Sequence, residues 1–114
     1  MQIELDEDMI MYHGQKKIYS SDGEELKEKG KWENTVSLGL FRQSGEKYAV
    51  DNDGNKSVLY RIYVPKGTKI TPILQMSQAE YRDESEVLLD KGHEYKVDSY
   101  YKERGYSVRD SRLI

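Results

Sequence analysis

The chain of 114 residues has no cysteine and only one Phe and one Trp. The absence of cysteine excludes a disulfide scaffold, thiolate chemistry and a zinc site built on cysteine. Apolar runs of the length of a membrane span are also missing. The first eight residues are acidic, which is typical of neither a signal peptide nor a transit peptide. We therefore expect a cytoplasmic protein, unless the chain is one domain of a longer exported protein.

An excess of one charge is missing as well. The sequence has 18 Lys and Arg against 21 Asp and Glu, giving a formal net charge of -3, and the two signs are interspersed. A nucleic-acid or membrane-surface binder needs a basic excess or stripe, so we expect neither partner. Aromatic content comes mainly from ten tyrosines, which suit half-buried strand faces and rings that stack on ligands. The length predicts a single domain, residues 1–114.

Residues 81–97 contain the most informative pattern. A charged segment with Glu84 and Glu86 leads into the apolar residues 87–89, and a turn at 90–92 is followed by a second short apolar alternation. This pattern predicts two strands of a tight corner or hairpin. Residues two apart on a strand share a face, so Glu84 and Glu86 would lie side by side if the strand begins that early. Of two neighbouring carboxylates, one can stay ionised while the other accepts a hydrogen bond or a proton. The alternative interpretation is a solvated acidic loop before a buried strand.

The rest of the chain predicts short strands and few helices. A Ser/Asp cap, early acids, late lysines and a terminal glycine indicate a helix at 21–30. A second, weaker helix is expected within 41–50, where Gly45 counts against it. We expect an α+β fold with a curved, mainly antiparallel sheet. The strands are predicted at 9–12, ended by His13 and Gly14, and at 31–40, 57–64, 69–74 and 106–114.

Two possible metal patterns fail. Residues 51–55 resemble the start of a calcium loop, but the twelfth position is Ile62 where a bidentate Glu is required. Asp53 and Gly54 are better interpreted as a turn that joins two strands. His13 and His93 lie far apart in the sequence without a nearby cluster of ligands. We therefore expect no metal site.

Two sequence words, YRIYVPKGT at 60–68 and ESEVLLDKG at 84–92, resemble the C-terminal half of mono-ADP-ribosyltransferases. These are the NAD-dependent bacterial toxins and their phage-encoded relatives, in which the second Glu of Glu-x-Glu acts on the ribose. The resemblance implies two small, mostly antiparallel packed sheets with an NAD cleft. It also implies that the chain could be part of a longer secreted or phage-delivered protein.

The resemblance implies an NAD-binding set on two strands. Tyr12, His13 and Gly14 match the aromatic-Arg position of the family, with His in place of Arg. A His there is similar to the diphtheria-toxin and poly-ADP-ribose-polymerase branch, where it binds the ribose of NAD. Thr35 and Ser37 match the Ser-Thr-Ser strand, of which only the last serine is kept. With no Arg at position 13, we expect weak NAD affinity.

Catalysis is assigned by the resemblance to Glu86 and Glu84. Glu86 would stabilise the oxocarbenium-like transition state, Glu84 would orient or deprotonate the acceptor, and Tyr81 would help engage it. The implied function is transfer of ADP-ribose from NAD to a protein side chain, with arginine favoured and nicotinamide released. Two alternatives remain open: a catalytically silent module that serves as an interaction or phage structural part, and an NAD glycohydrolase.

Overall fold

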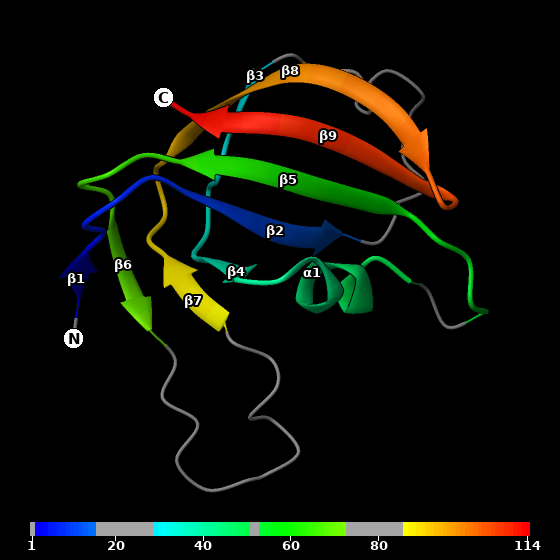
Figure 1. The fold of residues 1–114 in the computed structure, drawn as a ribbon, viewed down its shortest axis with the longest axis horizontal. Coiled ribbons are helices and arrows are strands. Elements are labelled where there is room, and N and C mark those ends of the chain that lie inside the picture. Colours follow the sequence, from blue (N-terminus) through cyan, green and yellow to red (C-terminus); the bar gives the residue numbers. More distant parts are fainter. Residues whose placement is uncertain (1, 16–28, 51–52, 73–85) are drawn as a thin grey trace, which may run out of the picture.

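The computed structural model describes residues 2–15, 29–50, 53–72 and 86–114 (Figure 1). These residues form nine strands and one helix. The elements are β1 (Ile3–Glu4), β2 (Met9–Gln15), β3 (Lys29–Lys31), β4 (Val36–Gly39), α1 (Arg42–Tyr48), β5 (Val58–Val64), β6 (Lys69–Pro72), β7 (Glu86–Leu89), β8 (Glu94–Glu103) and β9 (Tyr106–Leu113).

The strands form one hydrogen-bonded series in the order β1-β6-β7-β4-β2-β5-β9-β8-β3. The connection between β4 and β2 is a single residue pair, Tyr12 with Gly39, whereas β2 pairs with β5 over seven residues. The series therefore has a four-strand part, made of β1, β6, β7 and β4, and a five-strand part, made of β2, β5, β9, β8 and β3. The two parts are joined at one residue pair. In Figure 1, β6 and β7 lie at a steep angle to β2, β5 and β9.

The main core lies between these two parts. Its buried side chains come from β4, β6 and β7 on one side and from β2, β5 and β9 on the other. The strands that contribute more than one of these residues, β4, β5 and β7, contribute alternate ones, as expected when one face of a sheet is buried. The predicted α+β fold with two small, mostly antiparallel packed sheets is confirmed. The exception to the antiparallel rule is β5, which pairs in parallel with β9.

The weak helix prediction within 41–50 is also confirmed, and its glycine has a packing reason. A Cβ on Gly45 would lie 2.7 Å from the Cβ of Tyr12 and 2.9 Å from Leu59 Cδ1. On the facing strand, a Cβ on Gly14 would lie 1.9 Å from the carbonyl oxygen of Gly45. The helix and β2 approach so closely that neither position has room for a side chain. The residue that weakens the helix signal therefore fixes α1 against β2.

Three predicted boundaries are wrong. Residues 21–28 of the predicted helix lie outside the described residues, but its last two residues belong to β3, because they pair with β8. The predicted strand at 31–40 is split into β3 and β4. The strand predicted to end before His13 continues to Gln15, because His13 and Gly14 stay paired with Tyr60 and Leu59.

The turn at 90–92 forms a corner and no hairpin. β7 pairs with β4 and β6, whereas β8 pairs with β9 and β3. Gly92 has a φ of 98°, a conformation that glycine adopts without strain. Its N–H donates to the carbonyl of Trp32 at 2.7 Å, and the Trp32 N–H donates to the His93 carbonyl at 2.9 Å. The corner thus carries the chain from the four-strand part to the five-strand part and holds the residue after β3.

Candidate active site

The strands that carry Tyr12, Ser37 and Glu86 meet where the two parts of the sheet join. Gly39 of β4 pairs with Tyr12 of β2 on one side and with Glu86 of β7 on the other. Paired residues on neighbouring antiparallel strands have Cα atoms about 4.5–5.5 Å apart. Tyr12 and Glu86, 74 positions apart in the sequence, are therefore separated by one strand at a residue without a side chain.

Glu86 is the first residue of β7 and is half-buried. Its neighbours Val87 and Leu89 point into the core, so alternation places Glu86 on the opposite face of the strand. The β4–β7 register places Ser37 and Gly39 on that same face. The backbone of Glu86 is consequently held by strand pairing, which fixes the point from which its side chain extends.

His13 lies on the face of β2 that carries Met11 and faces the core. Its Nδ1 lies 3.0 Å from the carbonyl oxygen of Ser37. Because a carbonyl can only accept, Nδ1 carries the proton, and in the neutral ring Nε2 is left as an acceptor. Burial lowers the pKa of His13, although the bond to the Ser37 carbonyl acts in the opposite direction. His13 is therefore set up as a neutral hydrogen-bond acceptor.

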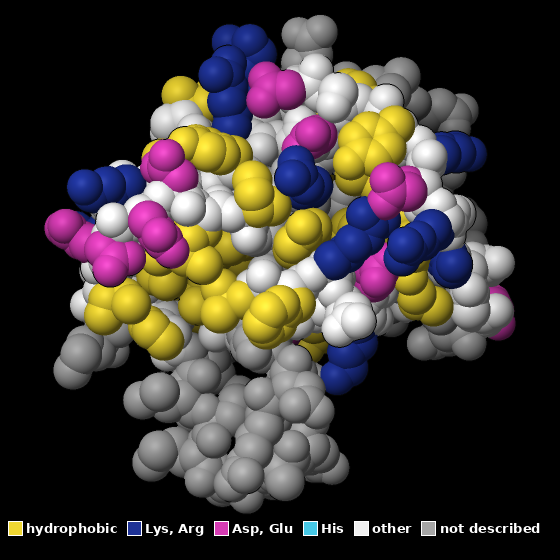
Figure 2. All heavy atoms as spheres, in the orientation of Figure 1, with side chains coloured by type: hydrophobic (Ala, Val, Ile, Leu, Met, Phe, Trp, Pro, Cys, Tyr) yellow, Lys and Arg dark blue, Asp and Glu magenta, His cyan; other side chains and the backbone are white. Residues whose placement is uncertain are grey.

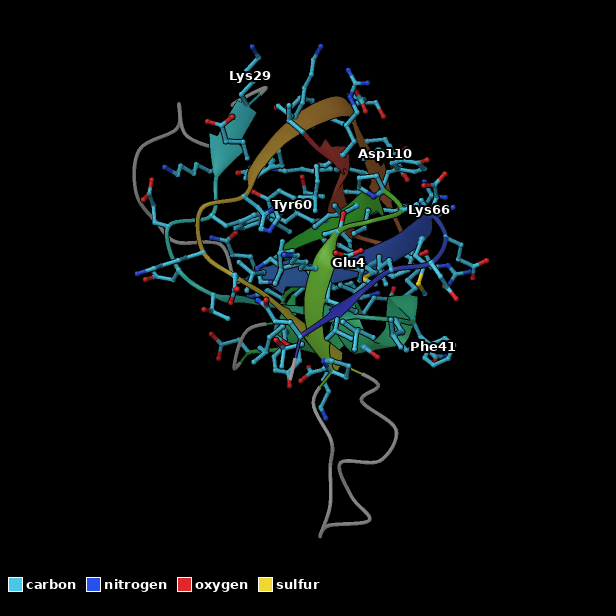
Figure 3. All side chains as sticks on the ribbon, turned by 90° about the vertical axis from the view of Figure 1, so that its left-hand side faces the viewer. Glu4, Lys29, Phe41, Tyr60, Lys66 and Asp110 are labelled. Atoms are coloured by element: carbon cyan, nitrogen blue, oxygen red, sulfur yellow. The ribbon has the colours of Figure 1, made fainter. Side chains whose placement is uncertain are left out.

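Aromatic rings enclose His13 from several elements. The Trp32 ring is edge-on to it at a centroid distance of 5.1 Å, and the Tyr60 ring lies at 5.9 Å. Trp32 also stacks on Tyr95 at 4.6 Å. Arg109 anchors this cluster by donating from Nη1 to the Tyr60 hydroxyl at 2.6 Å. Figure 3 shows Tyr60 inside the molecule, in contrast to Phe41 at its surface.

Tyr60, Tyr95 and Arg109 were not among the residues predicted for the site. Each belongs to a strand with ordinary alternation, and the only signal was the high number of tyrosines in the chain. Tyr60 pairs with His13 across β2 and β5, and Arg109 pairs with Tyr60 across β5 and β9. Only the strand order brings these residues together, and a single sequence does not give that order.

The remaining predicted residues are placed differently. Gly14 is buried beneath α1, where its backbone contacts the helix. Thr35 is exposed just before β4. Glu84 and Tyr81 lie outside the described residues, so their roles stay predictions. The proposed cleft lined by His13, Ser37 and Glu86 also stays a prediction.

Two absences hold for the described parts of the chain. Within these ranges, no three His, Asp or Glu side chains are grouped as a metal ion would require. None of the helical residues there forms a segment long and apolar enough to cross a membrane. The face seen in Figure 2 carries both signs of charge among apolar side chains, as the interspersed sequence predicts.

Comparisons with known proteins agree on one fold. The chain is similar to the C3larvin toxin, an ADP-ribosyltransferase from Paenibacillus larvae, with 19% identity and a TM-score of 0.65 over 98% of this chain and 64% of that one. It is similar to the Clostridium limosum C3 exoenzyme, with 17% identity and a TM-score of 0.73 over 98% and 62%. The ADP-ribosylating toxin BECa of C. perfringens, solved with NADH, gives 18% identity and a TM-score of 0.70 over 97% and 32%.

The chain thus spans less than two thirds of each of these three relatives. No curated protein sequence matches it. The sequence model described as ADP-ribosyltransferase exoenzyme matches residues 4–113, which is nearly the whole chain. That match includes both words on which the resemblance was based, at 60–68 and 84–92. The chain belongs to the ADP-ribosyltransferase exoenzyme family.

Proposed function

We propose that this chain binds NAD and transfers its ADP-ribose to a protein side chain, releasing nicotinamide. The observation that carries the proposal is the position of Glu86, at the start of a paired strand and one strand away from Tyr12. Family membership supplies the reaction class. The relative BECa, which was solved with NADH, supports a nicotinamide dinucleotide as the ligand.

The chemistry requires a carboxylate at that point. The bond between the nicotinamide nitrogen and the ribose C1′ breaks, and its electron pair leaves with nicotinamide. The ribose then carries a partial positive charge, which a fixed carboxylate stabilises as in glycoside hydrolysis. The acceptor supplies the electron pair for the new bond to C1′ and loses a proton. Glu86 would stabilise the cation, and Glu84 would take the proton or orient the acceptor.

His13 would contribute a hydrogen bond rather than a charge. Its Nδ1–H is engaged by the Ser37 carbonyl, so Nε2 would accept from a donor such as a ribose hydroxyl. An Arg at this position would bind the pyrophosphate in a bidentate way, which imidazole does not do. NAD should therefore bind weakly, and its recognition should depend on the ribose end.

The acceptor is proposed to be arginine. The pairing of Glu84 with Glu86 in a Glu-x-Glu motif is similar to arginine-modifying members of the family. The guanidinium of an arginine is charged at neutral pH, so the enzyme needs a carboxylate, here that of Glu84, to orient it or to remove its proton.

The test is to incubate the protein with NAD and to measure free nicotinamide and labelled ADP-ribose on protein, with and without an arginine-containing acceptor. Nicotinamide release together with label on the acceptor supports transfer. Release without label indicates an NAD glycohydrolase. If neither signal appears at millimolar NAD, the catalytically silent module is the interpretation that remains.

A further inference from the structure

The tip of the β8–β9 hairpin carries an arginine where the backbone favours other residues. The turn consists of Arg104 and Gly105, whose φ angles are 52° and 88°. A hairpin turn with positive φ at both positions prefers Asn, Asp or Gly at the first of them. In the described parts of the chain, Arg104 is the one residue other than glycine with a positive φ. Turn chemistry therefore does not explain an arginine at this place.

The backbone of this turn is nevertheless firmly held. Glu103 and Tyr106, which flank it, form the last pair between β8 and β9. Lys56 donates from Nζ to the carbonyl oxygen of Arg104 at 2.8 Å. A Cβ added to Gly105 would lie 3.0 Å from Lys56 Cδ, so the lysine stem lies against the turn. Arg104 itself is exposed, and its side chain is presented to solvent from a fixed point.

The guanidinium of Arg104 has no ion pair or hydrogen bond with the described residues. Glu103, its neighbour in the sequence, pairs with Arg42. An arginine without a contact, in a backbone conformation that side chains disfavour, indicates a role outside the fold. The other arginines in the described ranges all have a carboxylate or hydroxyl partner: Arg42 with Glu46 and Glu103, Arg61 with Asp110, Arg109 with Tyr60, and Arg112 with Asp98.

We propose that Arg104 is a self-modification site, to which a second copy of the protein transfers ADP-ribose from NAD. The inference rests on the proposed function with arginine as the acceptor. An acceptor arginine has to enter the active site of another molecule and to give up the contacts of its N–H groups. An unpaired guanidinium at the tip of a two-residue turn meets both conditions. In Figure 1 this tip lies well away from β7, which begins at Glu86, so the donor site belongs to the second copy.

The transfer needs no group beyond those of the proposed reaction. The bond between the nicotinamide nitrogen and the ribose C1′ breaks, and its electron pair leaves with nicotinamide. A terminal nitrogen of Arg104 supplies the electron pair of the new bond to C1′ and releases one proton to the acceptor carboxylate. Because the side chain makes no described contact that would be lost, the modified protein should unfold at the same temperature as the unmodified one.

The test is to incubate the wild-type protein with labelled NAD and no added acceptor, and to map the label by peptide mass spectrometry. The label is expected on Arg104. The initial rate of labelling per molecule should rise in proportion to the protein concentration, as a reaction between two copies requires.

The mutational test is Arg104→Lys, which keeps the positive charge and removes the guanidinium. This variant should lose the self-label, while it still releases nicotinamide and modifies an added arginine acceptor as the wild type does. Arg112→Lys is the matched control, because Arg112 is also exposed on this hairpin but pairs with Asp98 at 3.5 Å. The control should keep the self-label.

The outcomes separate this inference from the proposed function. If the wild type modifies an added acceptor but takes up no label, or carries it on another arginine such as Arg82 or Arg112, the assignment to Arg104 is wrong and the proposed function stands. A labelling rate per molecule that is independent of protein concentration would contradict transfer between copies. If no nicotinamide is released and nothing is labelled, the proposed function fails and this inference with it.

Discussion

His13 and Glu86 are both predicted for the candidate site but are positioned in different ways. Glu86 is placed by the backbone: it begins a short strand whose partner is a glycine. His13 is placed by side chains, because Trp32 and Tyr60 pack on its ring and the Ser37 carbonyl holds its Nδ1. A change at Glu86 should consequently alter the chemistry alone. A change around His13 should alter stability and binding together.

The largest expected effect comes from Glu86→Gln, which keeps the shape and removes the charge. NAD cleavage should fall by roughly 10²–10⁴-fold, with or without an acceptor. The melting temperature should stay close to that of the wild type, because the half-buried side chain makes no described ion pair that would be lost. Nicotinamide release and thermal unfolding, measured on the same preparation, check both halves of this expectation.

Glu84→Gln is the matched control, since it removes the same charge two residues earlier. It should spare slow NAD hydrolysis and abolish transfer to arginine, which is read as label incorporated into the acceptor. Equal losses of both activities in both variants would contradict the division of work between the two glutamates. Two fully active variants would rule out an enzyme that uses this motif.

A smaller effect is expected on the His13 side from Tyr60→Phe. Tyr60 and Arg109 are 2% and 8% exposed, and the substitution removes the acceptor of a bond to a buried cation. Hydrogen bonds to charged groups contribute about 1.5–3 kcal/mol, so the free energy of unfolding should fall by about that amount. Urea denaturation should show a lower midpoint with an unchanged slope.

Tyr101→Phe, which removes an exposed hydroxyl, should change the free energy of unfolding by less than about 0.5 kcal/mol. If Tyr60→Phe proves as mild as this control, the bond to Arg109 does not stabilise the cluster. The contrast between His13, held by side-chain packing, and Glu86, held by strand pairing, would then be lost.

The same contrast explains what the sequence could predict. The strand that begins at Glu86, and β5, follow from local patterns, namely apolar alternation and a glycine turn, whereas the short helix near Gly45 was predicted only weakly. The residues around His13 come from separate elements, and no period in the sequence connects Trp32, Tyr95 and Arg109. The predicted end of the helix at 21–30 failed for a related reason. Lys29 and Gly30 have ordinary helix-end chemistry, but pairing with β8 outweighs local propensity.

The smallest effect is the part of the pH dependence of stability that comes from His13. Burial lowers its pKa below the usual value of 6.5, so the unfolded chain takes up a proton at a pH where the folded protein does not. As the pH falls from 6.5 to the folded pKa, this difference lowers the free energy of unfolding. Above that window the contribution is fully present. The slope is at most about 1.4 kcal/mol per pH unit.

His13→Gln should remove this part of the pH dependence, because glutamine does not titrate. His93→Gln is the matched control, since it removes the other histidine and leaves the enclosed imidazole in place. Urea midpoints of the three proteins at a series of pH values below neutrality give the comparison. Wild type and His93→Gln should lose stability in parallel below pH 6.5, while His13→Gln should lose less. Parallel curves for all three would mean that the aromatic rings do not keep His13 neutral, and the neutral acceptor proposed for the ribose would have no basis.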